Sequence, residues 1–255
     1  MTLTVGSAAE RWGRELARWR IPDDILAKAP EDPWRIPPAL FAVEAESTLS
    51  PSHRRALEAL PAAGTVLDVG AGGGAMSRPL RERASRITAV DTSAAMLAQC
   101  DADVRLEGRW PDVASAAGVA DVVACGHVVY NVADIDPFIA ALTAAARSRV
   151  VLEFTAVHPL HNPVERELWR TVWGVERPDG PRAADLLSVL TEMGIASHQE
   201  RWTRERGDSP ERFAARVTLV RRHLCLPVER EPEVGAALRR APARPRELVT
   251  AWWDV

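Results

Sequence analysis

The chain has 255 residues, of which 47% are hydrophobic and 26% charged, with a formal net charge of −3. This composition is that of an ordinary globular protein, and the slightly negative charge argues against a nucleic-acid-binding surface. The three cysteines (100, 125 and 225) form neither a disulfide framework nor a Cys-x-x-Cys metal pair. The first ten residues lack a secretory signal, and no apolar run reaches the roughly 20 residues of a membrane span. We therefore expect a cytoplasmic protein with no membrane partner.

The first 50 residues are rich in tryptophan and proline, which predicts short helices interrupted by turns. Trp12, Leu16 and Trp19 are spaced i, i+4 and i+7 and so lie on one helical face. Such a segment cannot form a core alone. We expect residues 1–50 to be an N-terminal helical cap that packs on the main domain.

From residue 51 to 155 the pattern alternates between strands and helices. The predicted strands are 65–69, 87–90, 104–106, 120–124 and 149–154. The predicted helices are 52–60, 75–84, 93–100 and one that reaches about residue 146, with Asp136 as N-cap and Pro137 at its first position. This alternation predicts an α/β fold with a doubly wound, mostly parallel sheet covered on both faces.

The last hundred residues are less regular. A helix is expected over 183–193, ended by Gly194, and strands over 195–203 and 247–253 that form a final antiparallel hairpin. A further helix begins at 208–211 and has a stripe of Phe213, Val217, Val220 and Leu224. The sheet then has seven strands, in one domain over 51–255 with a helical insertion over 208–240.

The most informative segment is a glycine-rich turn between a buried strand and the next predicted helix. It contains Gly70, Gly72 and Gly74, and glycines let the backbone turn sharply and approach a ligand closely. The predicted helix N-terminus behind the turn suits a carboxylate or a phosphate. Asp91 follows Gly74 by seventeen residues, directly after the second strand. An acid there can accept hydrogen bonds from both ribose hydroxyls of a nucleoside.

Two ligand classes fit this turn. Gly70, Gly72 and Ala75 also satisfy the dinucleotide spacing, so an NAD-binding oxidoreductase is one alternative. Asp68 would repel a pyrophosphate, whereas a cationic sulfonium nucleoside would tolerate it. The Tyr–Lys pair of short-chain dehydrogenases is impossible, because Tyr130 and Lys28 are the only tyrosine and the only lysine. These residues favour the sulfonium nucleoside.

Three motifs resemble those of class I S-adenosylmethionine-dependent methyltransferases. Residues 66–74 (VLDVGAGGG) are similar to the first motif, 89–97 (AVDTSAAML) to the second and 120–130 (ADVVACGHVVY) to the fourth. The resemblance implies a Rossmann-like fold and S-adenosylmethionine as cofactor. It also implies a set of cofactor-binding residues: Asp68 at the amino end, Gly70, Gly72 and Gly74 along the methionine and ribose, and Asp91 with Thr92 at the ribose. Where the family often has an acid after the third strand, this chain has Arg109, followed by Trp110. Both are counted among the cofactor-binding residues, with Trp110 bordering the adenine or, as an alternative, filling a hydrophobic gap under the cap.

His127 and His158 are the candidate catalytic residues. His127 follows the fourth strand, where substrate and cofactor meet in such sheets, although a structural histidine that donates to a backbone carbonyl is slightly favoured over a catalytic one. A general base is needed only if the acceptor must lose a proton, and His127 is preferred to His158. The spacing of Glu153, His158 and His161 is a poor zinc signature, so no metal site is predicted.

The N-terminal segment and the insertion over 208–240 are expected to cover the site. They are rich in Trp, Leu and Val, which favours a small apolar or aromatic acceptor. An RNA or protein acceptor is the second interpretation, and nucleic-acid binding is disfavoured because Arg221-Arg222 and Arg239-Arg240 are expected on solvated helix faces. The unusual Arg109 also leaves open a non-catalytic protein that binds the cofactor as a sensor or scaffold.

Overall fold

The computed structural model describes residues 6–40, 49–204, 209–240 and 245–255, which build a seven-stranded sheet in the order β3-β2-β1-β4-β5-β7-β6. Strand β7 is antiparallel to both of its neighbours, β5 and β6, and the other six strands all run in one direction. The predicted doubly wound sheet with its final antiparallel hairpin is therefore confirmed. The strands are β1 (Gly64–Val69), β2 (Ala84–Asp91), β3 (Val104–Glu107), β4 (Ala120–Gly126), β5 (Ala146–Thr155), β6 (His198–Arg204) and β7 (Arg246–Asp254).

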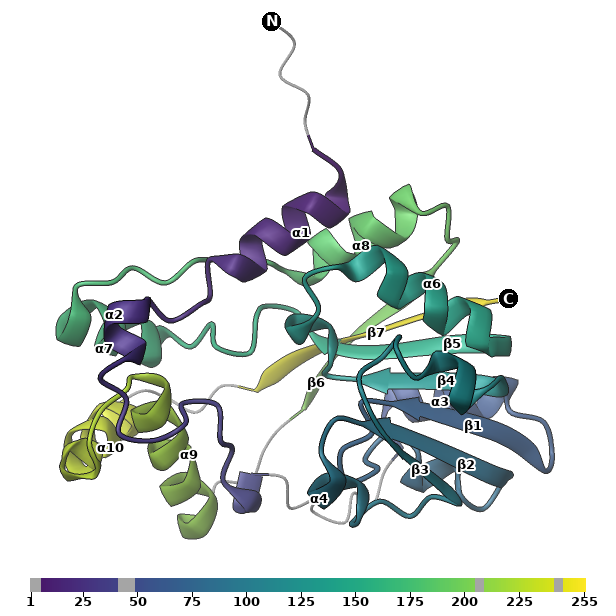
Figure 1. Ribbon diagram of the computed structural model, residues 1–255, viewed down its shortest axis with the longest axis horizontal. Helices are drawn as coiled ribbons and strands as arrows, with labels where there is room; N and C mark the ends of the chain where they lie inside the picture. Colours follow the sequence, from purple (N-terminus) through teal and green to yellow (C-terminus); the bar gives the residue numbers. More distant parts are fainter. Residues whose placement is uncertain (1–5, 41–48, 205–208, 241–244) are drawn as a thin grey trace, which may run out of the picture.

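Helices cover both faces of the sheet (Figure 1). One face carries α6 (Ile135–Ala145), α8 (Ala183–Glu192) and α1 (Ala8–Ala17), and the short α5 (Ala114–Ala117) packs against the same core. The other face carries α3 (Pro51–Ala59) and α4 (Ala94–Leu97). The central strands β1, β4 and β5 are almost wholly buried, as expected when apolar helices cover both faces.

Helix α1 joins the sheet domain through its tryptophan face. Ser7 and Glu10 form a capping box at its start, and Trp12 and Leu16 are buried against α6 and α8. The Trp12 indole N–H donates to the carbonyl of Val132 at 2.8 Å. Trp19 lies beyond the end of the helix, where its N–H donates to the carbonyl of Gly180. The predicted helical face of the N-terminal segment is thus the face that packs.

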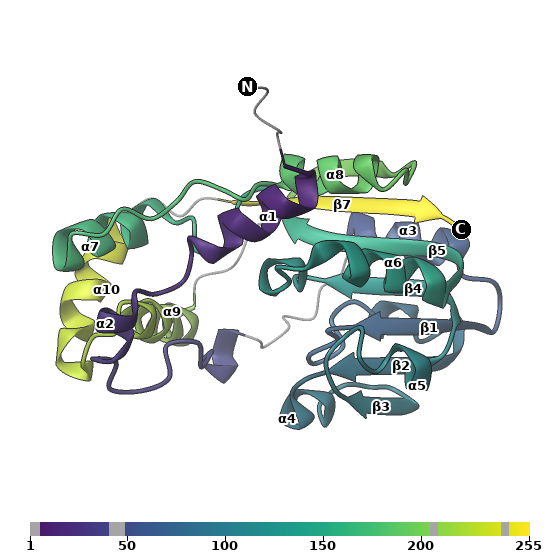
Figure 2. The ribbon, with the colours of Figure 1, turned by 45° about the horizontal axis from the view of Figure 1, so that its top comes forward.

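Four helices form a second group, which we call the helical lobe: α2 (Asp23–Leu26), α7 (Pro163–Trp173), α9 (Pro210–His223) and α10 (Glu231–Arg240). They share an apolar core of their own, which includes Ile25, Trp169, Leu224 and Leu238. In Figure 2 the lobe lies beyond the carboxyl ends of the parallel strands. This is the edge at which open α/β sheets bind ligands.

Two predicted helix positions are wrong. Residues 75–84 form turns and the 3-10 helix η2 (Arg78–Leu80), and β2 already begins at Ala84. The left-handed Gly74 (φ +81°) closes the preceding turn, and Pro79 lacks the amide that a helix through 75–84 would need. Helix α6 begins at Ile135 with Asp134 as N-cap, two residues before the predicted Asp136.

Helix α7 was not predicted, although its sequence carries a signal for it. The side chain of Asn162 caps the helix by accepting the amide of Val164 at 2.9 Å, and Pro163 stands at its first position. Leu168 and Trp169 are buried in the lobe core. The aromatic residues of this segment therefore pack the lobe.

Candidate functional site

The glycine turn connects the carboxyl end of β1 to η2 and lies beside the end of β2. Gly70, Gly72 and Gly74 have φ angles of +68°, +52° and +81°, all in the left-handed region that favours glycine. The amides of Gly70 and Ala71 donate to the carbonyl of Val90 at 2.8 and 3.0 Å. The turn is therefore held against the end of β2 by backbone hydrogen bonds.

Gly70 and Gly73 should respond differently to alanine. A Cβ on Gly70 would lie 2.1 Å from Cγ2 of Val128, whereas one on Gly73 would meet no atom within 4 Å. We expect Gly70→Ala to lower the free energy of unfolding by about 2 kcal/mol or more, from left-handed strain and overpacking. Gly73→Ala is the matched control and should be nearly neutral in denaturant titrations. Equal effects of the two variants would show that the turn is not closed as described.

Asp91 supports the glycine turn, and its carboxylate can still accept further hydrogen bonds. Its Oδ2 accepts the amide of Gly72 at 2.8 Å, and its Oδ1 accepts the amide of Ser93 at 2.9 Å. A carboxylate has about four lone-pair positions, so each oxygen retains one for a further donor. Asp91 can thus fix the glycine turn and accept ribose hydroxyls at the same time.

Asp68 is fully buried, and its carboxylate oxygens have no hydrogen bond of good geometry among the described residues, although the hydroxyl and amide of Ser77 lie near them. Burial raises the pKa of Asp68 to about 6; Ser77 opposes this shift, and the negative charge of Asp91 adds to it. A buried carboxylate without a partner is costly, so this site favours a cationic ligand group over a phosphate. The ammonium and sulfonium of S-adenosylmethionine fit that requirement.

The other predicted cofactor residues lie nearby with different exposure. Thr92 and Arg109 are exposed, after β2 and β3 respectively. Trp110 is buried in the main core, and its indole N–H donates to the carbonyl of Phe138 at 3.4 Å. This contact gives Trp110 a structural role, and the contacts of these three residues with the cofactor stay predictions.

His127 stands directly after β4 with a left-handed backbone (φ +60°), which is uncommon for a residue other than glycine. Its Nε2 lies 3.2 Å from Oε1 of Glu153, but neither ring nitrogen has a hydrogen bond of good geometry among the described residues. Both nitrogens are buried although the side chain is 33% exposed. Its backbone amide donates to the carbonyl of Glu153 at 2.7 Å. Burial lowers the pKa of His127, while Glu153 acts to raise it, so the imidazole is neutral at pH 7.

Glu153 links His127 to two other elements. Its Oε1 lies 3.3 Å from Nη2 of Arg204, and its Oε2 accepts the hydroxyl of Ser50 at 3.4 Å. Burial acts to raise the pKa of Glu153, but His127 and Arg204 outweigh it and hold the pKa at about 2. Glu153 is therefore an ionised carboxylate that lies beside the imidazole of His127.

His158 occupies a different environment from His127. It is buried and stacked on Trp19 with ring centroids 4.1 Å apart, and the edge of Tyr130 lies 5.7 Å away. Its Nδ1 accepts the amide of Leu160, and burial lowers its pKa to about 3. His161 instead faces Asp179 at 3.3 Å. Within the part of the chain that the structure describes, no group of three or more His, Cys, Asp or Glu is arranged to hold a metal ion.

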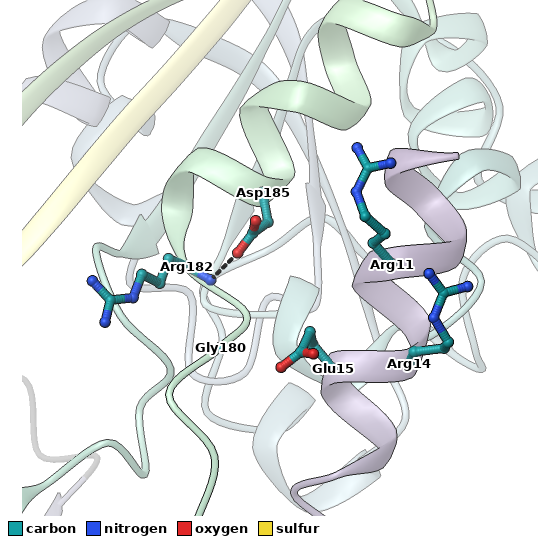
Figure 3. A pocket seen from close by; sticks show the side chains of 6 residues that line it. All are labelled: Arg11, Arg14, Glu15, Gly180, Arg182 and Asp185. Atoms are coloured by element: carbon teal, nitrogen blue, oxygen red, sulfur yellow. Dashed lines mark hydrogen bonds between the residues drawn. The ribbon is translucent and has the colours of Figure 1, made fainter. Parts of the chain in front are cut away.

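A hollow of about 470 Å³ lies between α1 and the segment that leads into α8. Arg11, Arg14 and Asp185 line it (Figure 3), but Asp185 accepts the amide of Arg182, and Arg11 forms an ion pair with Glu192. These groups are wholly or partly exposed, and Arg11 and Asp185 already have partners within the protein. The glycine turn, and not this hollow, has the features of a ligand site.

Comparison with known proteins decides the family. A family model described as a methyltransferase domain matches residues 41–196, more than half of the chain. The chain belongs to this methyltransferase family. Two solved structures share its fold: YcgJ from Bacillus subtilis (14% identity, 80% of this chain and 97% of that one, TM-score 0.52) and a candidate methyltransferase from an antibiotic biosynthesis pathway of Anabaena variabilis (12%, 80% and 96%, TM-score 0.55). No curated protein matches the sequence.

The methyltransferase takes its methyl group from S-adenosylmethionine and transfers it to an acceptor substrate. The resemblance of the three motifs is thereby confirmed, and the alternative of an NAD-binding oxidoreductase is disfavoured. The buried Asp68 and the left-handed glycines are consistent with this cofactor. None of the helices in the described ranges is both long and apolar enough to cross a membrane.

Sequence reasoning missed several charged residues that lie near His127. Arg204 and Arg246 were not singled out, because they belong to the final hairpin and are far in sequence from the motifs. Glu153 was considered only as a metal ligand, whereas it contacts His127. The position of these residues at strand ends could have indicated that they lie close together. The ends of β4, β5 and β6 and the start of β7 meet at one edge of the sheet.

Replacing Asp91 tests the cofactor site. We expect Asp91→Ala to weaken binding of the demethylated product, S-adenosylhomocysteine, about 10- to 100-fold, because hydrogen bonds to a charged acceptor are lost. Calorimetric titration measures this, with the exposed Asp101→Ala as control. Unchanged affinity of Asp91→Ala would mean that the ribose is held by other residues.

Proposed function

We propose that the methyltransferase acts on a small molecule whose nucleophilic atom must lose a proton, such as a hydroxyl, and that His127 accepts this proton. Asp68, Asp91 and the glycine turn hold the cofactor, with Thr92, Arg109 and Trp110 at its nucleoside end. The observation that carries the proposal is the His127–Glu153 pair at the carboxyl end of the sheet.

The geometry of this pair suits a general base. Nε2 of His127 lies 3.2 Å from the ionised Glu153 without the geometry of a hydrogen bond, and Nδ1 is buried with no hydrogen-bond partner among the described residues. With the ring proton on Nε2 beside this carboxylate, the lone pair of Nδ1 is the one left to take a proton. The lowered pKa of His127 keeps the ring neutral at pH 7, and Glu153 stabilises the imidazolium that forms when the ring takes a proton. His158, with its pKa of about 3 and its stack on Trp19, is the weaker candidate, and we assign it a packing role.

We further propose that the N-terminal segment (1–50) and the insertion (208–240) determine the acceptor. Helix α2 and the insertion helices α9 and α10 belong to the helical lobe, which lies beyond the carboxyl ends of the strands (Figure 2). Trp19 stacks on His158, and His158 in turn contacts Tyr130, which lies three residues after His127. These contacts link the end of the N-terminal helix to the region of His127. An acceptor held between the two parts is shielded from water.

A small acceptor is favoured over nucleic acid by the Arg221-Arg222 pair, whereas Arg239 and Arg240 are exposed, as predicted. Contrary to the predicted solvated face, Arg221 is buried and forms ion pairs with Glu31 and Glu231, and Arg222 is 2.7 Å from Glu31. These guanidinium groups are already neutralised and do not offer a phosphate-binding surface. The pair therefore fixes α9 to the N-terminal segment.

The bound cofactor supplies an activated methyl group whose leaving group is a neutral thioether. The chain's own task is to align the acceptor atom in line with that methyl carbon, exclude water and remove the proton. Such alignment is worth about 7–11 kcal/mol. Radiolabelled methyl transfer to a panel of small phenols and alcohols, and to total RNA, tests the proposal. Label found only in RNA would contradict it.

A further inference from the structure

Two arginines face each other at the edge of the sheet that carries His127. Arg204 ends β6 and Arg246 begins β7, and the two residues are directly paired in the antiparallel register. Paired residues project to the same face of a sheet, and like charges placed opposite each other are destabilising. A nearby anion would offset this repulsion between the two guanidinium groups.

Glu153 is that anion for Arg204. On β7, Thr250 is paired with Glu153 and lies four residues after Arg246, so Arg246 and Glu153 share one face of the sheet. Oε1 of Glu153 lies 3.2 Å from His127 and 3.3 Å from Arg204. The carboxylate is therefore already used by two partners.

Arg246, in contrast to Arg204, has no anionic partner in the described part of the chain. Among the residues that the structure describes, none forms an ion pair or a side-chain hydrogen bond with its guanidinium. The side chain is half-buried, and burial of the guanidinium lowers its pKa, with Tyr130 and Glu153 among the groups that affect it. A partly desolvated guanidinium without a partner is a preferred binding group for a planar anion.

We infer that Arg246 binds a carboxylate of the methyl acceptor, so that the substrate is a small organic acid. The inference rests on the proposed function, because it places the acceptor beside His127. In Figure 2 the start of β7 faces the helical lobe, at the same edge as the ends of the parallel strands. Anchoring one end of the acceptor on Arg246 would direct its nucleophilic atom to His127 and the cofactor.

The test uses small acids and their neutral amides as matched probes. Acetate, benzoate, salicylate and 4-hydroxybenzoate are titrated against the corresponding amides in the presence of saturating S-adenosylhomocysteine. We expect at least one acid to bind about tenfold more tightly than its amide, as a charge-assisted contact gives. Arg246→Gln should abolish this preference and Arg246→Lys should keep part of it.

Arg201→Gln is the matched control, because Arg201 lies on the other face of β6 and pairs with Glu247. All variants should bind S-adenosylhomocysteine with unchanged affinity, which also shows that they are folded. If no acid binds more tightly than its amide, or if Arg246→Gln keeps the preference, the inference is wrong. Loss of cofactor binding in the wild type would instead contradict the proposed function.

Discussion

Asp68→Asn should stabilise the ligand-free methyltransferase at neutral pH while weakening its cofactor binding. Burial raises the pKa of Asp68 from 3.8 to about 6, which corresponds to about 3 kcal/mol for holding the ionised form. Removing the charge should recover up to about 3 kcal/mol and raise Tm by about 5 °C at pH 7. The same change should weaken S-adenosylmethionine binding about tenfold or more, because the ammonium loses its carboxylate.

The contribution of Asp68 to the free energy of unfolding depends on pH with a definite sign. Because the folded pKa of Asp68 lies above the unfolded value, the native state binds more protons between pH 3.8 and about 6. The contribution of Asp68 to stability is therefore lost as pH rises through this window, and it stays lost above it. Cofactor affinity should follow the opposite trend and rise with pH through about 6, as the carboxylate ionises.

Asp103→Asn is the control with the opposite sign. Asp103 accepts the amide of Ile87 at 2.6 Å and pairs with Arg81 at 2.9 Å, and these contacts lower its pKa. The charge of Asp103 is stabilising, so its loss should lower Tm at pH 7. Calorimetric melting of both variants at pH 5 and 7 measures whether the two substitutions change Tm in opposite directions. A lower Tm for Asp68→Asn at pH 7 would show that the carboxylate has a stabilising partner.

The second large effect is expected for His127→Asn. Asparagine tolerates the left-handed backbone at this position (φ +60°), so the fold should persist. Loss of the general base should lower kcat about 100- to 10,000-fold for a hydroxyl acceptor. Affinity for S-adenosylhomocysteine should not change, and His198→Asn on the sheet edge should leave kcat as it is.

The pH profile of the wild type gives an independent check on His127. Because burial lowers its pKa, the base should stay neutral down to below pH 6.5, and kcat should fall only in more acidic solution. Glu153→Gln should lower the pKa further and move this limb to lower pH. A kcat for His127→Asn within threefold of the wild type would rule out His127 as the base.

Much of the fold was predictable because it depends on local patterns. Short apolar runs predicted most of the strands, and β6 was expected although its sequence is polar. The turn with its three left-handed glycines, together with Asp91, indicated the end of the sheet at which we expect the cofactor. The failures have local causes. Pro79 and the left-handed Gly74 prevent the helix expected over 75–84, and the short polar signal at Asn162 was overlooked.

The proposed acceptor side was harder to predict because it is assembled by long-range pairing. Nothing in the local sequence places Arg246 near Glu153; the β5–β7 and β6–β7 registers do so. The contact of Glu153 with His127 likewise requires β4 and β5 to be neighbours in the sheet. Sequence periodicity predicts elements and their faces, but it does not specify which strand ends meet.

A crystal structure of the methyltransferase with bound S-adenosylhomocysteine tests the central claim most directly. The account predicts the ribose hydroxyls within hydrogen-bond distance of both carboxylate oxygens of Asp91, and the ammonium beside Asp68. A nucleoside bound away from the glycine turn, or an Asp68 carboxylate that stays without a cationic partner, would contradict it.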